Sequence, residues 1–252
     1  MKVVINPAYS HLREDILNVV SGNYTAKRVM RDKRNRVELV SMQGCELVVK
    51  RYKRPNLFNR FAYSFLRKSK AQRAYEYAFR LLEMGVDTPK PVAYVEVRRK
   101  GLFSNGYFFS LYMPYGLMND AYTGVVPDSE KRQLTKEFMD FTLSLHEKKI
   151  LPMDFNSSNI FYFFDEKVGK YNFALTDINR MRFGKVPSTS EVMHSFEQFG
   201  VPVEGLYKMA VYYCSRKGVD VEYAIFIFLF HRLRSRIKRA LKVKAKKRLH
   251  IL

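Results

Sequence analysis

Three polar residues in the second half of the chain have the types and spacing that phosphoryl transfer requires. Asp154 is followed by Asn159, and Asp177 ends an apolar run that comes after a predicted hairpin. A loop carboxylate accepts the proton of an attacking hydroxyl, while amide and carboxylate oxygens hold Mg²⁺ against the phosphates of ATP. We therefore expect Asp154 to be the catalytic residue, with Asn159 and Asp177 as the metal ligands.

The same three residues also have simpler interpretations. Asp154 and Asn159 are residue types that shape turns, because their side chains bond to nearby backbone groups. Asp177 follows the buried run 173–176, so its carboxylate emerges where a strand meets a cleft. A carboxylate in that position needs a metal or a cation to remain charged. The catalytic interpretation therefore depends on whether the chain also contains suitable cationic partners.

The first half of the chain supplies one such cation and a carboxylate that could orient it. Lys50 ends the strand-like run 47–50, and Glu76 lies in the middle of a predicted helix over 70–84. Phosphoryl transfer needs a lysine to neutralise the nucleotide phosphates and a carboxylate to orient that lysine. A solvent-facing strand lysine is the alternative in a chain with 45 Lys and Arg. The order of all five residues along the chain favours the binding role.

A basic turn follows the first predicted strand of this half. Lys33 and Arg34 occupy the position at which a glycine-rich loop would cover ATP, and no G-x-G-x-x-G sequence is present. Their side chains either replace glycine backbone amides at the phosphates or are simply solvated. We count Lys33 and Arg34 as candidate nucleotide-binding residues and leave both interpretations open.

The elements that must position these residues change in type along the chain. Apolar periodicity predicts strands first and helices later. We expect a helix over 9–20, strands over 25–31, 36–42, 46–52, 92–99 and 107–112, the helix over 70–84, a hinge over 113–116, a helix over 129–147, a hairpin over 160–164 and 171–176, and helices from 191 onward. This order predicts an α+β, bilobal fold. Residues 1–113 form an N-lobe with a small antiparallel sheet and one orienting helix. Residues 114–252 form a reduced, mostly helical C-lobe with the catalytic loop, the metal site and a basic C-terminal helix.

The net charge of +21 attracts polyanions. The stretch after Glu222 has no acidic residue and carries ten cations: Arg232, Arg234, Arg236, Lys238, Arg239, Lys242, Lys244, Lys246, Lys247 and Arg248. Apolar residues interleave with them at near-helical spacing, which is typical of a helix on an anionic membrane surface. A solvated basic helix is the alternative. A nucleic-acid-binding protein fits the charge, but no motif of that kind accompanies it, and we expect no nucleic-acid partner.

Several motifs together resemble the lipopolysaccharide kinase (Kdo/WaaP) family, whose members have a protein-kinase-like fold. The resemblance covers about residues 28–182 and is carried by the motifs Val48-Val49-Lys50, Arg73-Ala74-Tyr75-Glu76, Met84-Gly85-Val86-Asp87-Thr88-Pro89-Lys90-Pro91-Val92-Ala93, Asp154-Phe155-Asn156-Ser157-Ser158-Asn159-Ile160 and Thr176-Asp177-Ile178-Asn179-Arg180. It implies ATP and Mg²⁺ as cofactors. It also implies an acceptor hydroxyl on a lipopolysaccharide core sugar, Kdo or heptose, attached to lipid A.

Two positions depart from the pattern of that family. Pro152 stands where relatives usually have a histidine that braces the catalytic loop, and Asp177-Ile178-Asn179 replaces the more usual Asp-Phe-Asp or Asp-Phe-Gly. The first departure keeps open a catalytically weak pseudokinase that binds nucleotide or glycolipid. The two cysteines, Cys45 and Cys214, are typical of reduced packing residues. We expect a cytoplasmic location, or a peripheral one on the inner face of the cytoplasmic membrane.

Overall fold

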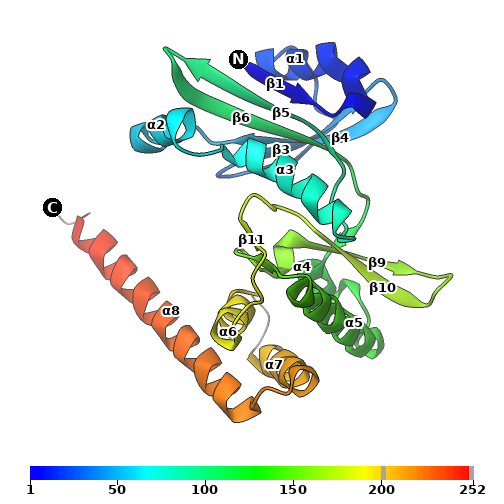
Figure 1. The fold of residues 1–252 in the computed structure, drawn as a ribbon, viewed down its shortest axis with the longest axis vertical. Helices are drawn as coiled ribbons and strands as arrows, with labels where there is room; N and C mark the ends of the chain where they lie inside the picture. The colour runs from blue at the N-terminus through cyan, green and yellow to red at the C-terminus, as the bar shows by residue number, and fades with distance from the viewer. Residues whose placement is uncertain (200–202, 250–252) are drawn as a thin grey trace. The chain divides into compact units, whose positions relative to one another are not determined.

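A six-stranded antiparallel sheet forms the first part of the computed structural model, which describes residues 1–199 and 203–249 (Figure 1). The strand order is β1-β5-β6-β4-β3-β2. These strands are β1 (Lys2–Ile5), β2 (Arg28–Asp32), β3 (Arg36–Met42), β4 (Cys45–Tyr52), β5 (Pro91–Arg99) and β6 (Leu102–Leu111). The sheet belongs to a compact unit of Met1–Pro114, and this unit also takes in Ala174–Arg180. The predicted division at residue 113 treats each lobe as continuous, whereas this unit includes a segment that returns from later in the chain.

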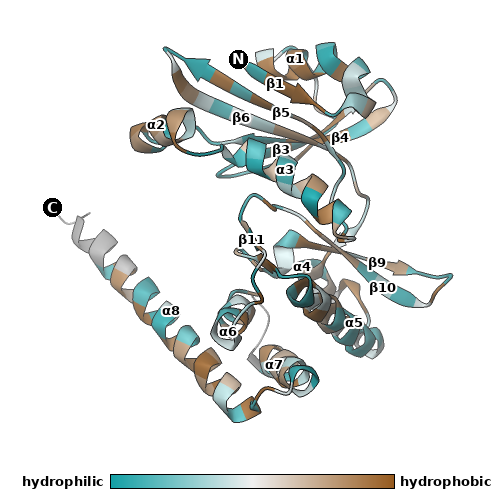
Figure 2. Ribbon diagram, viewed as in Figure 1, coloured by the Kyte–Doolittle hydropathy of each residue, from teal (hydrophilic) through white to brown (hydrophobic). Residues whose placement is uncertain are grey.

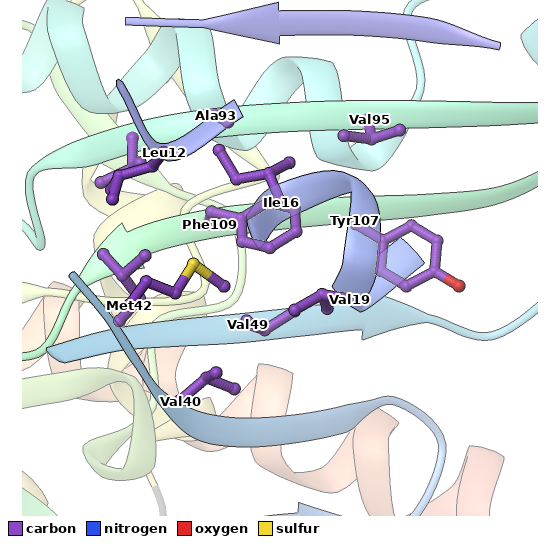
Figure 3. Packing of buried hydrophobic residues seen from close by; sticks show 12 residues of the cluster. Leu12, Ile16, Val19, Val40, Met42, Val49, Ala93, Val95, Tyr107 and Phe109 are labelled. Carbon is purple, nitrogen blue, oxygen red and sulfur yellow. The ribbon is translucent and has the colours of Figure 1, made fainter. Parts of the chain in front are cut away.

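One face of the sheet is covered by the N-terminal helices η1 (Pro7–Leu12) and α1 (Arg13–Ser21). Leu12, Ile16 and Val19 pack there against alternate strand residues such as Val49 and Phe109 (Figure 3). Each of these side chains is almost fully buried, and burying a large apolar side chain stabilises a fold by about 1.5–3 kcal/mol. The core of this unit therefore lies between the sheet and α1.

The other face of the sheet is covered by α3 (Lys70–Glu83). Ala71 and Tyr75 of this helix pack against Tyr52 and Tyr94 of the strands. Successive side chains of a strand point to opposite faces. Since Leu47 and Val49 face α1, Lys50 and Tyr52 belong to the α3 face of β4.

A further helix, α2 (Leu57–Phe65), lies in the stretch before α3. Asn56 caps it, because its side-chain oxygen accepts a hydrogen bond from the backbone N–H of Asn59 at 3.0 Å. The sequence suggested only a basic, aromatic connector here. The strand β1, which pairs with β5, was likewise not predicted.

The second unit comprises Tyr115–Phe173 and Met181–Leu252 and is mostly helical. Its elements are β7 (Gly116–Leu117), α4 (Met118–Asp120), the π-helix η2 (Ala121–Val125), α5 (Asp128–Glu147), β8 (Ile150–Pro152), η3 (Ser157–Asn159), β9 (Ile160–Asp165), β10 (Lys170–Leu175), β11 (Met181–Phe183), α6 (Thr189–Gln198), α7 (Val203–Lys217) and α8 (Val221–Leu249). Strands β10, β9 and β7 form one small sheet and β8 with β11 a second.

Aromatic rings from different elements form much of the core of this unit. The ring of Phe138 in α5 stacks on Phe199 at 4.9 Å and on Phe155 at 5.9 Å, and it meets Phe173 edge-on at 5.5 Å. These contacts join α5 to the segment that contains Asp154. The fold is α+β, with an antiparallel-sheet unit and a mostly helical unit, as the sequence predicted.

The hydropathy of the helices differs from one to the next (Figure 2). Among the described residues, no helix has the length and apolar character needed to cross a bilayer. The long helix α8 includes the basic stretch predicted from the sequence. Of the basic residues predicted there, the side chains of Lys242, Lys246, Lys247 and Arg248 lie outside the part of the chain whose side chains are described.

Candidate functional site

Lys50 and Asp177 form an ion pair in the sheet unit. Nζ of Lys50 lies 2.5 Å from Oδ1 of Asp177, and the two side chains are 14% and 25% exposed. The alternation along β4 turns Lys50 to the α3 face, and the returning segment Ala174–Arg180 brings Asp177 to the same place. A partly buried ion pair is screened less than one at the surface. The pair therefore marks a charged position inside this unit.

Backbone contacts attach the returning segment to the sheet unit. The backbone N–H of Leu175 donates to the carbonyl of Asp87 at 2.9 Å, and Oγ1 of Thr88 donates to the carbonyl of Leu175 at 2.7 Å. Thr88 is buried, so its hydroxyl would otherwise lack a partner. Both contacts come from the Thr-Pro passage that follows α3. That passage therefore positions the segment that ends in Asp177.

The backbone of Asp177 has a left-handed conformation, with φ of 53°. Asn179 stabilises this turn from the side, because its Nδ2 donates to Oδ1 of Asp177. Nε of Arg73, in α3, donates to the carbonyl of Asn179 at 3.1 Å. Non-glycine residues with positive φ are uncommon and concentrate at functional sites. Arg73, Thr88 and Asn179 thus position Asp177, and the sequence analysis assigned none of them a role.

Glu76 lies in α3, as predicted, and binds two neighbours on its own side of the helix. Its carboxylate accepts hydrogen bonds from Nζ of Lys68 at 2.7 Å and from Nε2 of Gln72 at 2.9 Å. Lys50 instead pairs with Asp177 and lies 5.4 Å from the centre of the Tyr52 ring. The predicted pairing of Lys50 with Glu76 stays a prediction.

The basic turn between β2 and β3 borders two adjoining cavities of the sheet unit. Arg34 lines both, one of about 370 Å³ and one of about 470 Å³, whereas Lys33 lines only the larger. Lys53 and Arg54, which follow β4, also line both. Cations of the turn and of the segment after β4 therefore line the same cavities, which was not predicted from the sequence.

Asp154 and Asn159 lie together in the helical unit. Nδ2 of Asn159 donates to the backbone carbonyl of Asp154 at 3.0 Å. Asn156 caps the 3₁₀ turn η3 by accepting from the backbone N–H of Ser158 at 3.1 Å. The side chain of Phe155 is buried, and the backbone N–H of Ser157 donates to the carbonyl of Phe199 at 3.1 Å. The loop is thus held rigidly, with Asp154 exposed.

Pro152 has a structural position just before this loop. It is buried in β8 and lies opposite Met181 of β11 in an antiparallel ladder. Proline removes a backbone donor from a ladder, which confines it to short or edge strands. The ladder contributes to the bracing of the loop that follows it.

The oxygens of these residues suit a hard divalent cation. Mg²⁺ is bound in proteins by one or two side-chain oxygens together with substrate phosphates. Asp177 offers a carboxylate, and Asn159 offers its Oδ1 because its Nδ2 already donates to Asp154. Among the described residues there is no group of three or more His, Cys, Asp or Glu side chains that would hold a metal by itself.

Burial and neighbouring charges shift the pKa values of two residues near the ion pair. Burial raises the pKa of the Tyr52 hydroxyl well above its usual value, and the charge of Asp177 adds to this effect. Burial lowers the pKa of Lys70, at the start of α3, and the nearby cation Arg34 lowers it further. The environment of Lys70 therefore disfavours another positive charge and favours an anion.

Comparison with known proteins supports the fold. No family profile and no curated protein matches the chain. Among solved structures, WaaP in complex with acyl carrier protein aligns over 94% of this chain and 98% of that chain, with a TM-score of 0.63 and 13% sequence identity. The chain has a WaaP-like kinase fold. A crystal structure of WbdD aligns over 84% of this chain and 46% of that chain, with a TM-score of 0.47 and 14% identity.

The WaaP match bears on the resemblance read from the motifs. It confirms the kinase-like fold that the resemblance implied, because the alignment extends over nearly the whole of both chains. At 13% identity it carries the fold alone. Activity, acceptor and the roles of single residues are therefore argued from the chemistry of this chain.

Proposed function

We propose that the chain is an ATP-dependent kinase that phosphorylates a sugar hydroxyl of the lipopolysaccharide inner core, on Kdo or on a heptose attached to lipid A. The observation that carries this proposal is the 2.5 Å ion pair between Lys50 and Asp177. A strand lysine next to the carboxylate of a returning segment is the arrangement that neutralises nucleotide phosphates in kinases. The WaaP-like fold adds support, since it supplies a scaffold on which this chemistry occurs.

Each predicted residue has one role in this proposal. Lys50 binds the nucleotide phosphates, and Glu76 orients Lys50. Asp177 and Asn159 hold Mg²⁺, which neutralises phosphate charge when it is bound. Asp154 accepts the proton of the sugar hydroxyl, and Lys33 and Arg34 bind phosphate oxygens from the basic turn. Because the transition state of phosphoryl transfer is loose, positioning and charge neutralisation supply most of the rate enhancement.

Lys50 must change partner during the proposed reaction. In the pair with Asp177 both charges are neutralised, so neither is free for a ligand. We expect Asp177 to turn to the metal and Lys50 to the phosphates when nucleotide binds. Glu76 then exchanges Lys68 for Lys50. The ion pair thus joins the two groups to which the proposal assigns the phosphates and the metal.

The charge of the chain suits an acidic glycolipid acceptor. An inner-core sugar on lipid A carries carboxylate and phosphate groups, and the net charge of +21 attracts such a ligand. Helix α8 presents the exposed apolar residues Leu233, Ile237 and Leu241 among its cations. Apolar and basic residues interleaved in this way favour an anionic membrane surface. We therefore propose a peripheral location on the inner face of the cytoplasmic membrane, with α8 as one contact.

The decisive experiment is incubation of the chain with Mg²⁺, labelled ATP and purified core acceptors. We expect label to transfer to intact Kdo-lipid A, and more slowly to its deacylated form if the membrane contact contributes. The variants Asp154→Asn and Asp177→Asn are the matched controls, since each keeps the size of the side chain and removes its charge. Label transfer by Asp154→Asn at the wild-type rate contradicts the role of this residue.

A nucleotide-binding or glycolipid-binding module without catalysis is the second candidate. One observation favours it: Pro152 stands in place of a bracing histidine. A module of this kind gains thermal stability from Mg-ATP, because ligands that bind only the folded state stabilise it. It forms no phosphorylated product with any core acceptor. Product formation decides between the two candidates.

A further inference from the structure

Helix α2 is attached to the sheet unit by one side only. Nε of the buried Arg60 donates to the backbone carbonyl of Phe103 at 2.8 Å, and Oγ of Ser64 accepts from the backbone N–H of Phe103 at 2.8 Å. The Tyr63 ring meets the Phe103 ring edge-on at 5.4 Å. These contacts fix the orientation of the helix on β6. Because the helix contacts β6 through this side, its opposite side is exposed.

The exposed side of α2 is strongly apolar. Figure 2 colours part of this helix as hydrophobic. It comprises five large side chains: Leu57, Phe58, Phe61, Phe65 and Leu66. Phe58 is 77% exposed and Leu66 is 73% exposed. At about 100° per residue, the first four of the five fall within about 100° of arc on the helix surface. Soluble monomers rarely leave such a patch open, and one rimmed by polar groups marks an interaction site. We call these five residues the α2 apolar face.

The surroundings of this face are basic. The stretch 47–75, which contains α2 and both its flanks, includes no Asp or Glu. Arg67 and Lys68 follow the helix, and Lys53 and Arg54 precede it. Long cationic side chains next to exposed aromatic rings are typical of helices that lie in the interface of an anionic bilayer. The charge also opposes pairing of the face with a second copy of this chain, because both copies carry the same excess of cations.

A cavity lies at the N-terminal end of α2. It measures about 370 Å³, and its wall includes Asn56 and Asn59 of the first turn together with four cations, Arg34, Lys53, Arg54 and Lys70. None of the residues that line it is acidic. Within the part of the chain that the structure describes, these four cations form no ion pair. The cavity is thus large enough for a phosphate group and carries uncompensated positive charge.

Two further observations indicate an anion in this cavity. Burial lowers the pKa of Lys70 and the charge of Arg34 lowers it further, while Asp177 opposes the shift, so positive charge prevails around this side chain. Tyr52 lines the cavity and also lies under Lys50, with Nζ 5.4 Å from its ring centre. An anion in this cavity would therefore bind near Lys50, which does not itself line the cavity.

We propose that the α2 apolar face and the cavity at its N-terminal end form one site for a phosphate-bearing membrane lipid. The apolar face enters the boundary between headgroups and acyl chains, and the cavity receives the lipid phosphate between Lys53, Arg54 and Lys70. This surface is made by other elements than α8, and its role does not depend on phosphoryl transfer. It deepens the proposed function, because it gives a lipid-linked acceptor a docking surface in the same unit as Lys50.

Vesicle binding tests this proposal without nucleotide, so its failure is distinguishable from failure of the kinase proposal. We expect the full chain to sediment with phosphatidylcholine vesicles that contain phosphatidylglycerol, and much less with phosphatidylcholine alone. The variant Phe58→Ser/Phe61→Ser/Phe65→Ser should bind the anionic vesicles at least ten-fold more weakly. Its matched control, Phe164→Ser/Val168→Ser/Val186→Ser, removes three exposed apolar side chains of the helical unit and should bind as the wild type does.

The cavity has its own variant and control. Lys53→Gln/Arg54→Gln should lose most of the preference for phosphatidylglycerol, whereas Arg13→Gln/Lys136→Gln removes the same charge from exposed positions outside the cavity and should keep it. Glycerol 3-phosphate should compete with the anionic vesicles in the wild type. Unchanged vesicle binding by the triple phenylalanine variant overturns the proposal. Two other results also overturn it. One is a wild-type chain that does not bind vesicles but self-associates, with the self-association abolished in the triple phenylalanine variant. The other is an equal loss of preference for phosphatidylglycerol in the two charge variants.

Discussion

The buried histidine His146 gives a quantitative prediction for the helical unit. It lies near the end of α5, is 1% exposed, and its Nδ1 is 3.0 Å from the hydroxyl of Tyr213 in α7. Burial, together with the charges of Lys217 and Arg182, lowers the pKa of His146 from 6.5 to about 4. The folded chain therefore keeps this ring neutral over a range of pH in which the unfolded chain protonates it.

The sign and size of the effect follow from this difference in pKa. Because the folded-state value is the lower one, the contribution of His146 to stability is fully present above about pH 6.5 and is lost as the pH falls toward 4. Each pH unit by which the pH falls in this window lowers the free energy of unfolding by about 1.4 kcal/mol. Between pH 7.5 and pH 5 the loss amounts to about 2 kcal/mol of unfolding free energy.

Urea unfolding followed by far-UV circular dichroism measures this loss. The wild type and His146→Gln are unfolded at both pH values, and the variant should lose about 2 kcal/mol less between them. Glutamine removes the titrating ring and keeps a group that bonds to the Tyr213 hydroxyl. His11→Gln, at an exposed position, is the matched control and should follow the wild type. Parallel pH dependence of His146→Gln and the wild type refutes the reasoning.

Three further predictions concern the site and its supports. Asp154→Asn and Asp177→Asn should each fold with unchanged circular dichroism and lose at least about 100-fold in kcat of phosphate transfer, measured with labelled ATP. Thr88→Val removes a buried hydrogen bond to the returning segment and should lower unfolding free energy by about 1–2 kcal/mol in urea titrations. Hydrogen bonds from Arg182 lower the pKa of Glu191 to about 2, so its contribution is present above about pH 4.5 and is lost as the pH falls toward 2. Because this pair is about one-third exposed, Glu191→Gln should lower the free energy of unfolding by only about 1 kcal/mol at neutral pH. The free energy of unfolding of the variant should also fall less steeply than that of the wild type as the pH is lowered toward 2.

Much of the secondary structure was predictable because its signals are local. The helix expected over 70–84 is α3 (Lys70–Glu83), and the helix expected over 129–147 is α5 (Asp128–Glu147). In both, apolar residues recur at the helical period, and Ser69 caps the first of them. The strands around Lys50 also follow the predicted ranges closely, because β-branched residues are dense there.

The prediction failed where the local signal was ambiguous. The stretch between Lys53 and Ser69 is rich in cations and aromatic residues, so it was interpreted as a basic, aromatic connector. In the structure its polar residues Arg60 and Ser64 bond to β6 and its phenylalanines are exposed. A helix that buries its polar side inverts the pattern on which the prediction relies.

By itself, the sequence determined the types of the elements, their order and which residues carry reactive groups, because periodicity, turn chemistry and side-chain chemistry are properties of neighbouring positions. Only the tertiary structure decided that Lys50 pairs with Asp177 and that Glu76 binds Lys68. It also decided that four cations from separate segments line one cavity. These outcomes depend on the return of Ala174–Arg180 to the sheet unit and on the packing of α2 and α3, which bring together residues far apart in the chain. Such long-range contacts are fixed by the balance of burial and hydrogen bonding over the whole unit, and no local pattern records that balance.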